Sequence, residues 1–224
     1  MKILLVAATP PETAQIREQL GIEMKQSHIG SAHFDPYFIE VLHTGIGMVN
    51  TAFHLGKYFS QEKPDLAINL GIAGSFSRDF ALGEVVEVVR DQFSELGAED
   101  GEDFLDLKAM GFPLFEKGGK KYYNSLSNPH NSSLGLKKVS GITINTVHGN
   151  EQSIKKLLKR YEVVVESMEG AAFFQACLQE EVKFYAIRSI SNYVERRDRS
   201  KWNIPLALST VQNLLFQMFR ESVL

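Results

Sequence analysis

The chain has 224 residues, of which 44% are hydrophobic and 23% are charged, and its formal net charge is -3. This length suits one large domain, and the composition is that of a globular protein rather than of a disordered or collagen-like chain. Neither a basic excess nor a long run of like charges is present, so the sequence argues against nucleic acid as a partner and favours small molecules.

The sequence also predicts the compartment. The single cysteine, Cys177, cannot form an internal disulfide, which fits a reducing environment. The N-terminal apolar run from Ile3 to Ala8 is too short for a signal-peptide core. No stretch reaches the ~20 apolar residues of a membrane-spanning helix. We therefore expect a cytoplasmic protein that does not engage a membrane.

The first half of the chain predicts buried strands and helices. The run at 2–8 is apolar without alternation, which is typical of a strand buried on both faces of a parallel sheet. Residues 12–20 predict a helix with acidic Glu12 at its start and Gly21 after its end. A two-stranded hairpin with a turn at residues 30–36, a helix and two further strands follow, at 22–29, 37–43, 47–59, 65–70 and 84–91.

The second half predicts an irregular segment and then regular alternation. Residues 93–138 are rich in Gly, Ser, Asn and charge, and a loop of such length is usually functional. Strands and helices then alternate over 139–146, 150–160, 162–166, 169–181, 183–190 and 204–221. The pattern predicts a single α/β domain over 1–224, with a twisted, mainly parallel central sheet flanked by helices.

Several familiar motifs are absent from the sequence. The segment at 45–50 has Asn50 where a dinucleotide fingerprint needs its third glycine. The chain has no GxxxxGK[ST] phosphate loop, no metal-binding spacing of His or Cys, and no GxSxG nucleophile elbow. We therefore expect no cofactor, no metal ion and no acyl-serine chemistry.

Polar and glycine-rich segments follow the predicted strands. In an open parallel sheet, ligands bind outside the carboxyl ends of the strands, so these segments are expected to meet at one site. Four of them, in this order, are TGIGMVN (44–50), NLGIAGSF (69–76), ESMEGAA (166–172) and RSISN (188–192). Together they resemble the signature segments of the purine nucleoside phosphorylase and nucleosidase superfamily, along nearly the whole chain.

Three further stretches resemble futalosine hydrolases more than methylthioadenosine/adenosylhomocysteine nucleosidases. They are ELGAEDGEDF (95–104), GITINTV (141–147) and SNYVERRDRSKW (191–202). The resemblance implies a nucleoside phosphorylase-like fold and hydrolysis of the N-glycosidic bond of a purine nucleoside. Ile144 and Asn145, within the second stretch, are candidate substrate-binding residues.

The resemblance also assigns roles to single residues. It implies that Glu12 activates the attacking water, with Arg188 beside it, and that Glu169 and Met168 grip the ribose. Gly71 and Gly74 let the backbone pass close to the sugar. Each of these residues also has a plain structural interpretation: a helix start, a salt bridge, a core methionine or a tight turn.

Asn192 departs from the adenosine-cleaving relatives, which have Asp at this position. A carboxamide cannot transfer a proton, but it can donate one hydrogen bond to nitrogen 7 of the purine and make another near the 6-position. Because a 6-oxopurine leaves more readily as an anion, Asn192 predicts a hypoxanthine-like base. Asp198 is the alternative acid, and Asn192 as a turn residue is the structural alternative.

Two segments are candidates for binding a 5′ substituent. Phe104, Phe112, Pro113 and Phe115 form an aromatic group that suits an aryl ring, in a partner subunit's site if the protein is a dimer as its relatives are. Arg196, Arg197, Arg199 and Lys201 suit a carboxylate, although such a charge run is more often a solvated face.

Three other functions compete with this prediction. A purine nucleoside phosphorylase needs a phosphate site, but Pro10, Pro11 and Glu12 follow the first strand here and apolar Leu70 precedes Gly71. Asn192 argues against a methylthioadenosine nucleosidase. A non-catalytic nucleoside-binding module has no need for Glu12, Arg188 and Glu169 together.

Overall fold

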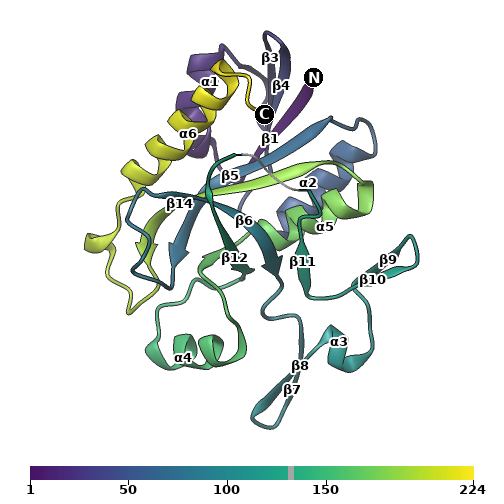
Figure 1. The fold of residues 1–224 in the computed structure, drawn as a ribbon, viewed down its shortest axis with the longest axis vertical. Helices are drawn as coiled ribbons and strands as arrows, with labels where there is room; N and C mark the ends of the chain where they lie inside the picture. Colours follow the sequence, from purple (N-terminus) through teal and green to yellow (C-terminus); the bar gives the residue numbers. More distant parts are fainter. Residues whose placement is uncertain (131–133) are drawn as a thin grey trace.

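In the computed structural model, which describes residues 1–130 and 134–224, a twisted sheet lies between two pairs of helices (Figure 1). The helices are α1 (Ala14–Leu20), α2 (Met48–Phe59), α3 (Leu107–Met110), α4 (Glu151–Arg160), α5 (Gly170–Glu180) and α6 (Ile204–Arg220), with 3₁₀ turns η1 (Pro10–Glu12) and η2 (Arg199–Lys201). The strands are β1 (Lys2–Ala7), β2 (Glu23–Gln26), β3 (Ile29–Phe34), β4 (Tyr37–His43), β5 (Leu66–Ser75), β6 (Val85–Gln92), β7 (Gly97–Asp100), β8 (Asp103–Asp106), β9 (Phe115–Lys117), β10 (Lys120–Tyr122), β11 (Ser125–Ser127), β12 (Lys137–Thr143), β13 (Val165–Ser167) and β14 (Phe184–Tyr193).

The main sheet has an open part and a closed part. In the open part, β1 is parallel to both β4 and β5, and β3 and β2 continue from β4 as antiparallel strands. In the closed part, β5 pairs with β14, β14 with β6, β6 with β12, β12 with β13, and β13 returns to β5. These five strands therefore form a ring.

The α/β class with helices flanking a twisted sheet is confirmed, and the strand directions are mixed. The β14–β6 and β13–β5 pairs are antiparallel, although β14 is parallel to β5 and β12 is parallel to β13. These antiparallel pairs are what allow the ring to close. Their partners are distant in the chain, and the regular alternation of elements along the sequence does not reveal them.

The core lies on both faces of the sheet, as the continuous apolar run of β1 predicts. Ile3 and Leu5 point to one face, where they pack with α1 and α6, while Leu4 and Val6 point to the other, with α2 and α5. Successive side chains of a strand alternate between its two faces, so a strand covered on both sides has no polar position. The two helix pairs are seen on opposite sides of the sheet in Figure 1.

The predicted helix at 12–20 begins later than expected. Glu12 belongs to η1, and α1 starts at Ala14. Pro10 and Pro11 occupy the first positions of the 3₁₀ turn, and the Glu12 side chain accepts a hydrogen bond from the Thr9 backbone N–H. This capping box makes a separate turn that fixes Glu12.

The hairpin predicted at 22–43 is a three-stranded meander, and Gly30 and Ser31 lie inside β3 rather than in a turn. A methyl group at Gly30 would lie 2.5 Å from the Glu23 carbonyl oxygen of β2. The glycine is therefore required by the close approach of a neighbouring strand. The turn before β4 is formed by Asp35 and Pro36.

Strands β5 and β14 are longer than predicted, because they pair with each other along their length from Phe184 and Ala67 to Tyr193 and Ser75. The glycines of β5 and the polar residues of β14 therefore lie within strands, not after them. By contrast, β12 ends at Thr143, three residues earlier than predicted, and β13 is limited to Val165–Ser167.

The segment predicted to be irregular, 93–138, contains regular elements. It holds two small hairpins, β7–β8 and β9–β10, the short helix α3, and β11, which joins the main sheet beside β6. Figure 1 shows both hairpins projecting from the body of the domain. Residues 131–133 of this stretch lie outside the described residues.

Candidate active site

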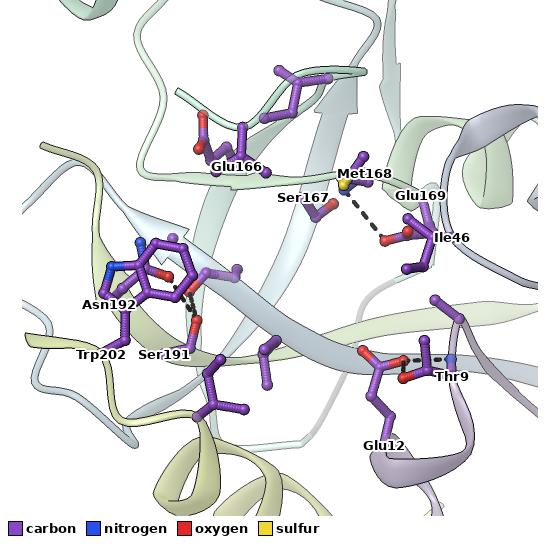
Figure 2. A pocket seen from close by; sticks show the side chains of 17 residues that line it. Thr9, Glu12, Ile46, Glu166, Ser167, Met168, Glu169, Ser191, Asn192 and Trp202 are labelled. Atoms are coloured by element: carbon purple, nitrogen blue, oxygen red, sulfur yellow. Dashed lines mark hydrogen bonds between the residues drawn. The ribbon is translucent and has the colours of Figure 1, made fainter. Parts of the chain in front are cut away.

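A cavity of about 260 Å³ lies where η1, β5, β13, β14 and the loops after β4 and β12 meet (Figure 2). A concave, mostly apolar site with a few convergent polar groups is typical of small-molecule binding. Six of the predicted site residues line it: Glu12, Gly74, Ile144, Met168, Glu169 and Asn192.

Figure 2 shows Glu12 and Glu169 on one side of the cavity and Asn192 and Glu166 on the other. We call one side the Glu12 end, which comprises Thr9, Glu12, Ile46, Met168 and Glu169. We call the other side the Asn192 end, which comprises Glu166, Ser191, Asn192 and Trp202.

The Glu12 carboxylate is held by one of its oxygens. Oε2 accepts hydrogen bonds from the Thr9 backbone N–H at 2.8 Å and from the Thr9 hydroxyl at 3.1 Å. Figure 2 shows Oε1 turned toward the interior of the cavity. Burial raises the pKa of Glu12, and the charge of Glu169 adds to this, while the Thr9 bonds and Arg188 oppose it. This arrangement suits a fixed proton acceptor.

Gly71 makes room for that oxygen. A methyl group at Gly71 would lie 2.7 Å from Glu12 Oε1 and 4.0 Å from Arg188 Nε. Gly71 lies in β5, next to the Glu12 side chain. It was predicted to let the backbone pass close to the ligand, but in the structure it lets the backbone pass close to the Glu12 carboxylate. The same glycine brings Glu12 and Arg188 near one another.

Arg188 lies behind the cavity wall. It is buried in β14, where its Nη1 donates to the Asn69 carbonyl oxygen at 3.0 Å and its Nη2 donates to Asn69 Oδ1. Burial lowers the pKa of Arg188, and the nearby carboxylates of Glu169, Asp91 and Glu12 raise it. The guanidinium thus contributes positive charge next to Glu12 while its hydrogen bonds fix it to Asn69, a residue that the sequence analysis missed.

Glu169 is positioned by the turn before α2. Its Oε1 accepts a hydrogen bond from the Gly47 backbone N–H at 2.9 Å, and Oε2 accepts one from Met168 N–H at 3.3 Å. Gly47 has a φ of 93°, a left-handed conformation that favours glycine. The segments TGIGMVN and ESMEGAA therefore meet physically, as their joint prediction at one site requires.

Asn192 reaches the cavity through an irregularity in β14. The register with β5 shifts between Ile190 and Asn192, so Ser191 is an extra residue that re-aims the side chain after it. Asn192 Oδ1 accepts from the Ser191 hydroxyl at 2.8 Å, and Nδ2 donates to the Tyr193 carbonyl oxygen at 3.2 Å. One N–H and one acceptor position of the amide remain for a ligand.

Gly74 gives Asn192 its space. A methyl group there would lie 3.2 Å from Asn192 Nδ2 and 2.9 Å from Val194 Cγ2. Like Gly71, it is a strand residue, so both glycines of NLGIAGSF are needed for close packing against a site residue rather than for a tight turn.

Several residues that line the cavity have no role predicted from the sequence. Glu166 is the charged member of this set and Trp202 the aromatic one, while Ile46, Val147 and Ile204 are among the apolar members. Glu166 could have been predicted from the sequence. It ends the apolar run VVVE, and burying an acidic side chain is costly unless a partner or ligand compensates for it. Trp202, the single tryptophan, lies under Arg197, whose guanidinium is 4.8 Å from the ring centre.

Other predicted residues lie away from this cavity. Asn145 lines a neighbouring cavity of about 180 Å³ with Met48, and its Nδ2 donates to Glu95 at 3.1 Å. Phe104 stacks under the guanidinium of Arg160 at 4.2 Å, and Phe112 is 63% exposed. The structure does not bring these three side chains to the Glu12 or Asn192 end.

The basic segment after β14 is exposed, including Arg196, Arg199 and Lys201. Asp198, the alternative acid, caps η2 by accepting a hydrogen bond from the Ser200 backbone N–H at 3.1 Å. It lies in the loop outside the cavity, so Asn192 is the predicted base-contacting residue that the structure places at the site.

Metal-binding clusters and membrane-spanning helices are absent from the part of the chain that the structure describes. Among residues 1–130 and 134–224, no group of three or more His, Cys, Asp or Glu side chains is arranged to hold a metal ion. Within the same residues, no helix combines the length and hydropathy needed to cross a bilayer.

Comparison with known proteins shows the family to which the chain belongs. The model of the phosphorylase superfamily matches residues 2–220, and the chain belongs to this superfamily. A futalosine hydrolase from Thermus thermophilus is 32% identical over 186 residues, which cover 80% of each chain. The relatives of this chain also include enzymes named methylthioadenosine/adenosylhomocysteine nucleosidase. The chain therefore groups with the N-glycosyl hydrolases, as the signature segments predict.

Solved structures confirm the nucleoside phosphorylase-like fold. Futalosine hydrolase from Helicobacter pylori matches with a TM-score of 0.80 at 17% identity, over 99% of this chain and 98% of that one. A methylthioadenosine/adenosylhomocysteine nucleosidase from Colwellia psychrerythraea, in complex with adenine, matches with the same TM-score at 21% identity, over 99% and 95%. The fold is thus common to enzymes named for different nucleosides.

Proposed function

We propose that the chain hydrolyses the N-glycosidic bond of futalosine, a 5′-substituted 6-oxopurine nucleoside, and releases hypoxanthine and dehypoxanthine futalosine, a step of menaquinone biosynthesis. The observation that carries the proposal is the presence of Glu12 and Asn192 in one cavity. The first is a proton acceptor for water. Asn192 offers the leaving base an amide rather than an acid.

The Glu12 end supplies the hydrolytic chemistry. Cleavage passes through a cation-like ribosyl transition state, which is attacked by water and stabilised by nearby negative charge. Glu12 Oε1 takes the proton of the water, while Oε2 stays bound to Thr9. Glu169, fixed by Gly47, accepts hydrogen bonds from the ribose hydroxyls, and Met168 lies against the sugar.

The Asn192 end supports the departure of a 6-oxopurine. The free N–H of the Asn192 amide donates to nitrogen 7, where negative charge grows as the bond breaks. A hypoxanthine anion needs less help than an adenine anion, which leaves best when an acid protonates it. An amide without a transferable proton therefore favours hypoxanthine.

The charges at the Glu12 end favour water over phosphate as the acceptor. Glu12 and Glu169 both line this end, and the guanidinium of Arg188 is turned to Asn69. A phosphate dianion beside two carboxylates is repelled at short range. Neutral water meets no such penalty.

The 5′ substituent is assigned to the rim of the cavity near α2, where a second copy of the chain would complete the site. Val49 and Phe53 of α2 are 77% and 65% exposed, and Ile46 beside them lines the cavity. Adjacent exposed apolar residues of this kind favour a protein contact. We propose a cytoplasmic homodimer in which Phe104 or Phe112 lies near the partner's site.

One assay tests the function. The protein is incubated with futalosine, inosine and methylthioadenosine, with and without phosphate, and the free base and sugar product are identified. We expect hypoxanthine from futalosine at a phosphate-independent rate. A ribose 1-phosphate product would identify a phosphorylase, preferential release of adenine would identify a methylthioadenosine nucleosidase, and binding without cleavage would identify a non-catalytic module.

A further inference from the structure

Glu166 is a buried acid at the Asn192 end that the proposed chemistry does not use. Its side chain is 3% exposed and lines the cavity from β13. Figure 2 shows it on the same side of the cavity as Asn192 and Trp202, opposite Glu12. A methyl group at Gly74 would lie 3.2 Å from Asn192 Nδ2 and 3.5 Å from Glu166 Cγ, so the two side chains flank the same backbone position.

The Glu166 carboxylate is held in a fixed orientation by His148. Oε1 accepts the His148 backbone N–H at 3.1 Å, and Oε2 lies 2.7 Å from His148 Nδ1. The hydrogen bond to Glu166 raises the pKa of His148, which favours an imidazolium and carboxylate pair. Two bonds use about half of the acceptor positions of a carboxylate, so Glu166 retains capacity for a further donor.

The chemistry of the purine decides which donor fits. In a 6-oxopurine, nitrogen 1 carries a hydrogen and donates; in a 6-aminopurine, nitrogen 1 has a lone pair and accepts. An ionised carboxylate only accepts hydrogen bonds, so it attracts the first and repels the second. Nitrogens 1 and 7 lie on either side of the substituent at the 6-position of the purine. Two adjacent side chains can therefore form hydrogen bonds with both nitrogens.

We propose that Glu166, oriented by His148, accepts a hydrogen bond from nitrogen 1 of a 6-oxopurine and so selects this base over a 6-aminopurine. The inference rests on the proposed function, because it concerns the base of the same substrate. Asn192 then supports the leaving of the base, and Glu166 reads its identity. The alternative role for Glu166 is a clamp that only holds the loop of Val147 and His148 against β13.

Two variants separate these roles. Glu166→Gln keeps the shape but replaces the charge, while His148→Ala removes one partner of the clamp and leaves the carboxylate. The measured quantity is kcat/KM for futalosine and for its 6-amino analogue, with the exposed Glu162→Gln as the matched control. A thermal unfolding scan checks that each variant is folded.

Glu166→Gln should lower kcat/KM for futalosine by about 10- to 100-fold, the usual effect of losing a charged hydrogen bond, and change the 6-amino analogue much less. His148→Ala removes the side chain that orients the carboxylate, so it should lower the ratio of futalosine to analogue in the same direction by a smaller factor, whereas a clamp alone predicts similar losses on both substrates. An unchanged substrate ratio in folded Glu166→Gln overturns the inference and leaves the clamp.

A second measurement uses the wild-type protein and does not depend on a variant that folds. Inosine is compared with 1-methylinosine, which lacks the hydrogen on nitrogen 1. We expect at least about a tenfold loss of kcat/KM for the methylated nucleoside. Equal values overturn the inference, whereas failure of the wild type to release hypoxanthine from futalosine overturns the proposed function itself.

Discussion

The Glu12 end and the Asn192 end of the cavity are built in different ways. At the Glu12 end, the carboxylates of Glu12 and Glu169 are fixed by backbone N–H groups of Thr9 and Gly47 in short turns. At the Asn192 end, the polar groups lie on strands β13 and β14, and each has a side-chain partner, His148 or Ser191, in addition to one backbone group. Backbone groups are the same for any sequence, whereas side-chain partners change with each substitution.

This difference suggests a division of labour. We propose that the Glu12 end carries out chemistry that is independent of the base and that the Asn192 end decides which base is accepted. Substitutions at the Glu12 end should therefore lower activity on every nucleoside by the same factor. Substitutions at the Asn192 end should change the ratio between nucleosides.

The largest effect is expected at Glu12 itself. Glu12→Gln retains the shape but cannot take a proton from water, so kcat should fall by about 10²- to 10⁴-fold on futalosine and on inosine alike, with little change in binding. Steady-state kinetics check this, with exposed Glu18→Gln as the control. Near-normal turnover would remove Glu12 from the mechanism, and a loss confined to one base would contradict the division of the two ends.

Asn192→Asp should act on the substrate ratio. An ionised Asp faces the 6-oxo oxygen and repels it, while a protonated Asp can donate to nitrogen 7 of adenine. We expect the ratio of kcat/KM for futalosine over its 6-amino analogue to fall by about 10- to 100-fold. Exposed Asn213→Asp is the control. An unchanged ratio would show that Asn192 does not read the base, which would shift attention to the 141–147 segment and Glu166.

Gly71→Ala tests how precisely Glu12 is placed. The added methyl group would lie 2.7 Å from Oε1 and must displace the carboxylate. A shift of about 1 Å at a reacting group can cost up to about 100-fold, so we expect kcat to fall by about 10- to 100-fold on both substrates. Gly56→Ala, in α2 with open space around the site, is the matched control. Full activity of Gly71→Ala would mean that the position of Oε1 does not matter.

The smallest effect is a shift in pH dependence. Burial, with the charge of Glu169, raises the pKa of Glu12 above its ordinary value of 4.5. Since the base must be ionised, kcat/KM should fall about tenfold per pH unit below this raised pKa and level off above it. A pH profile of the wild type should show an acidic limb above pH 4.5 that is absent from Glu12→Gln. A limb at or below 4.5 would contradict the buried environment of Glu12.

Much of the architecture could be read from local patterns. The apolar runs predicted β1 and the first part of β5, and helical periodicity predicted α2, α4, α5 and α6 to within a residue or two. These elements depend on which neighbouring positions in the chain are buried. The hydrophobic pattern within a short stretch of sequence is enough to indicate this. Met168, Glu169 and Asn192, from the signature segments, and Glu12, after the first strand, were also predicted to share one site, and these four residues line one cavity.

What a window of sequence does not record is pairing between distant strands. The partnership of β5 with β14 extended both strands past their predicted ends, and the bulge at Ser191 aimed Asn192 into the cavity. The pairing of β13 with β5 brought Glu166 beside Gly74. In each case the position of a site residue depends on a strand that is remote in the chain.

The sequence by itself determined the α/β class, most helices and which segments supply the Glu12 end. Tertiary structure alone decided the closed ring of β5, β14, β6, β12 and β13, the reason for Gly71 and Gly74, and the placement of Glu166. Local propensity and hydrophobic periodicity are properties of consecutive residues. The space left by Gly71 beside Glu12 of η1, and by Gly74 beside Asn192 of β14, is fixed only when long-range hydrogen bonding has set the distances between these segments.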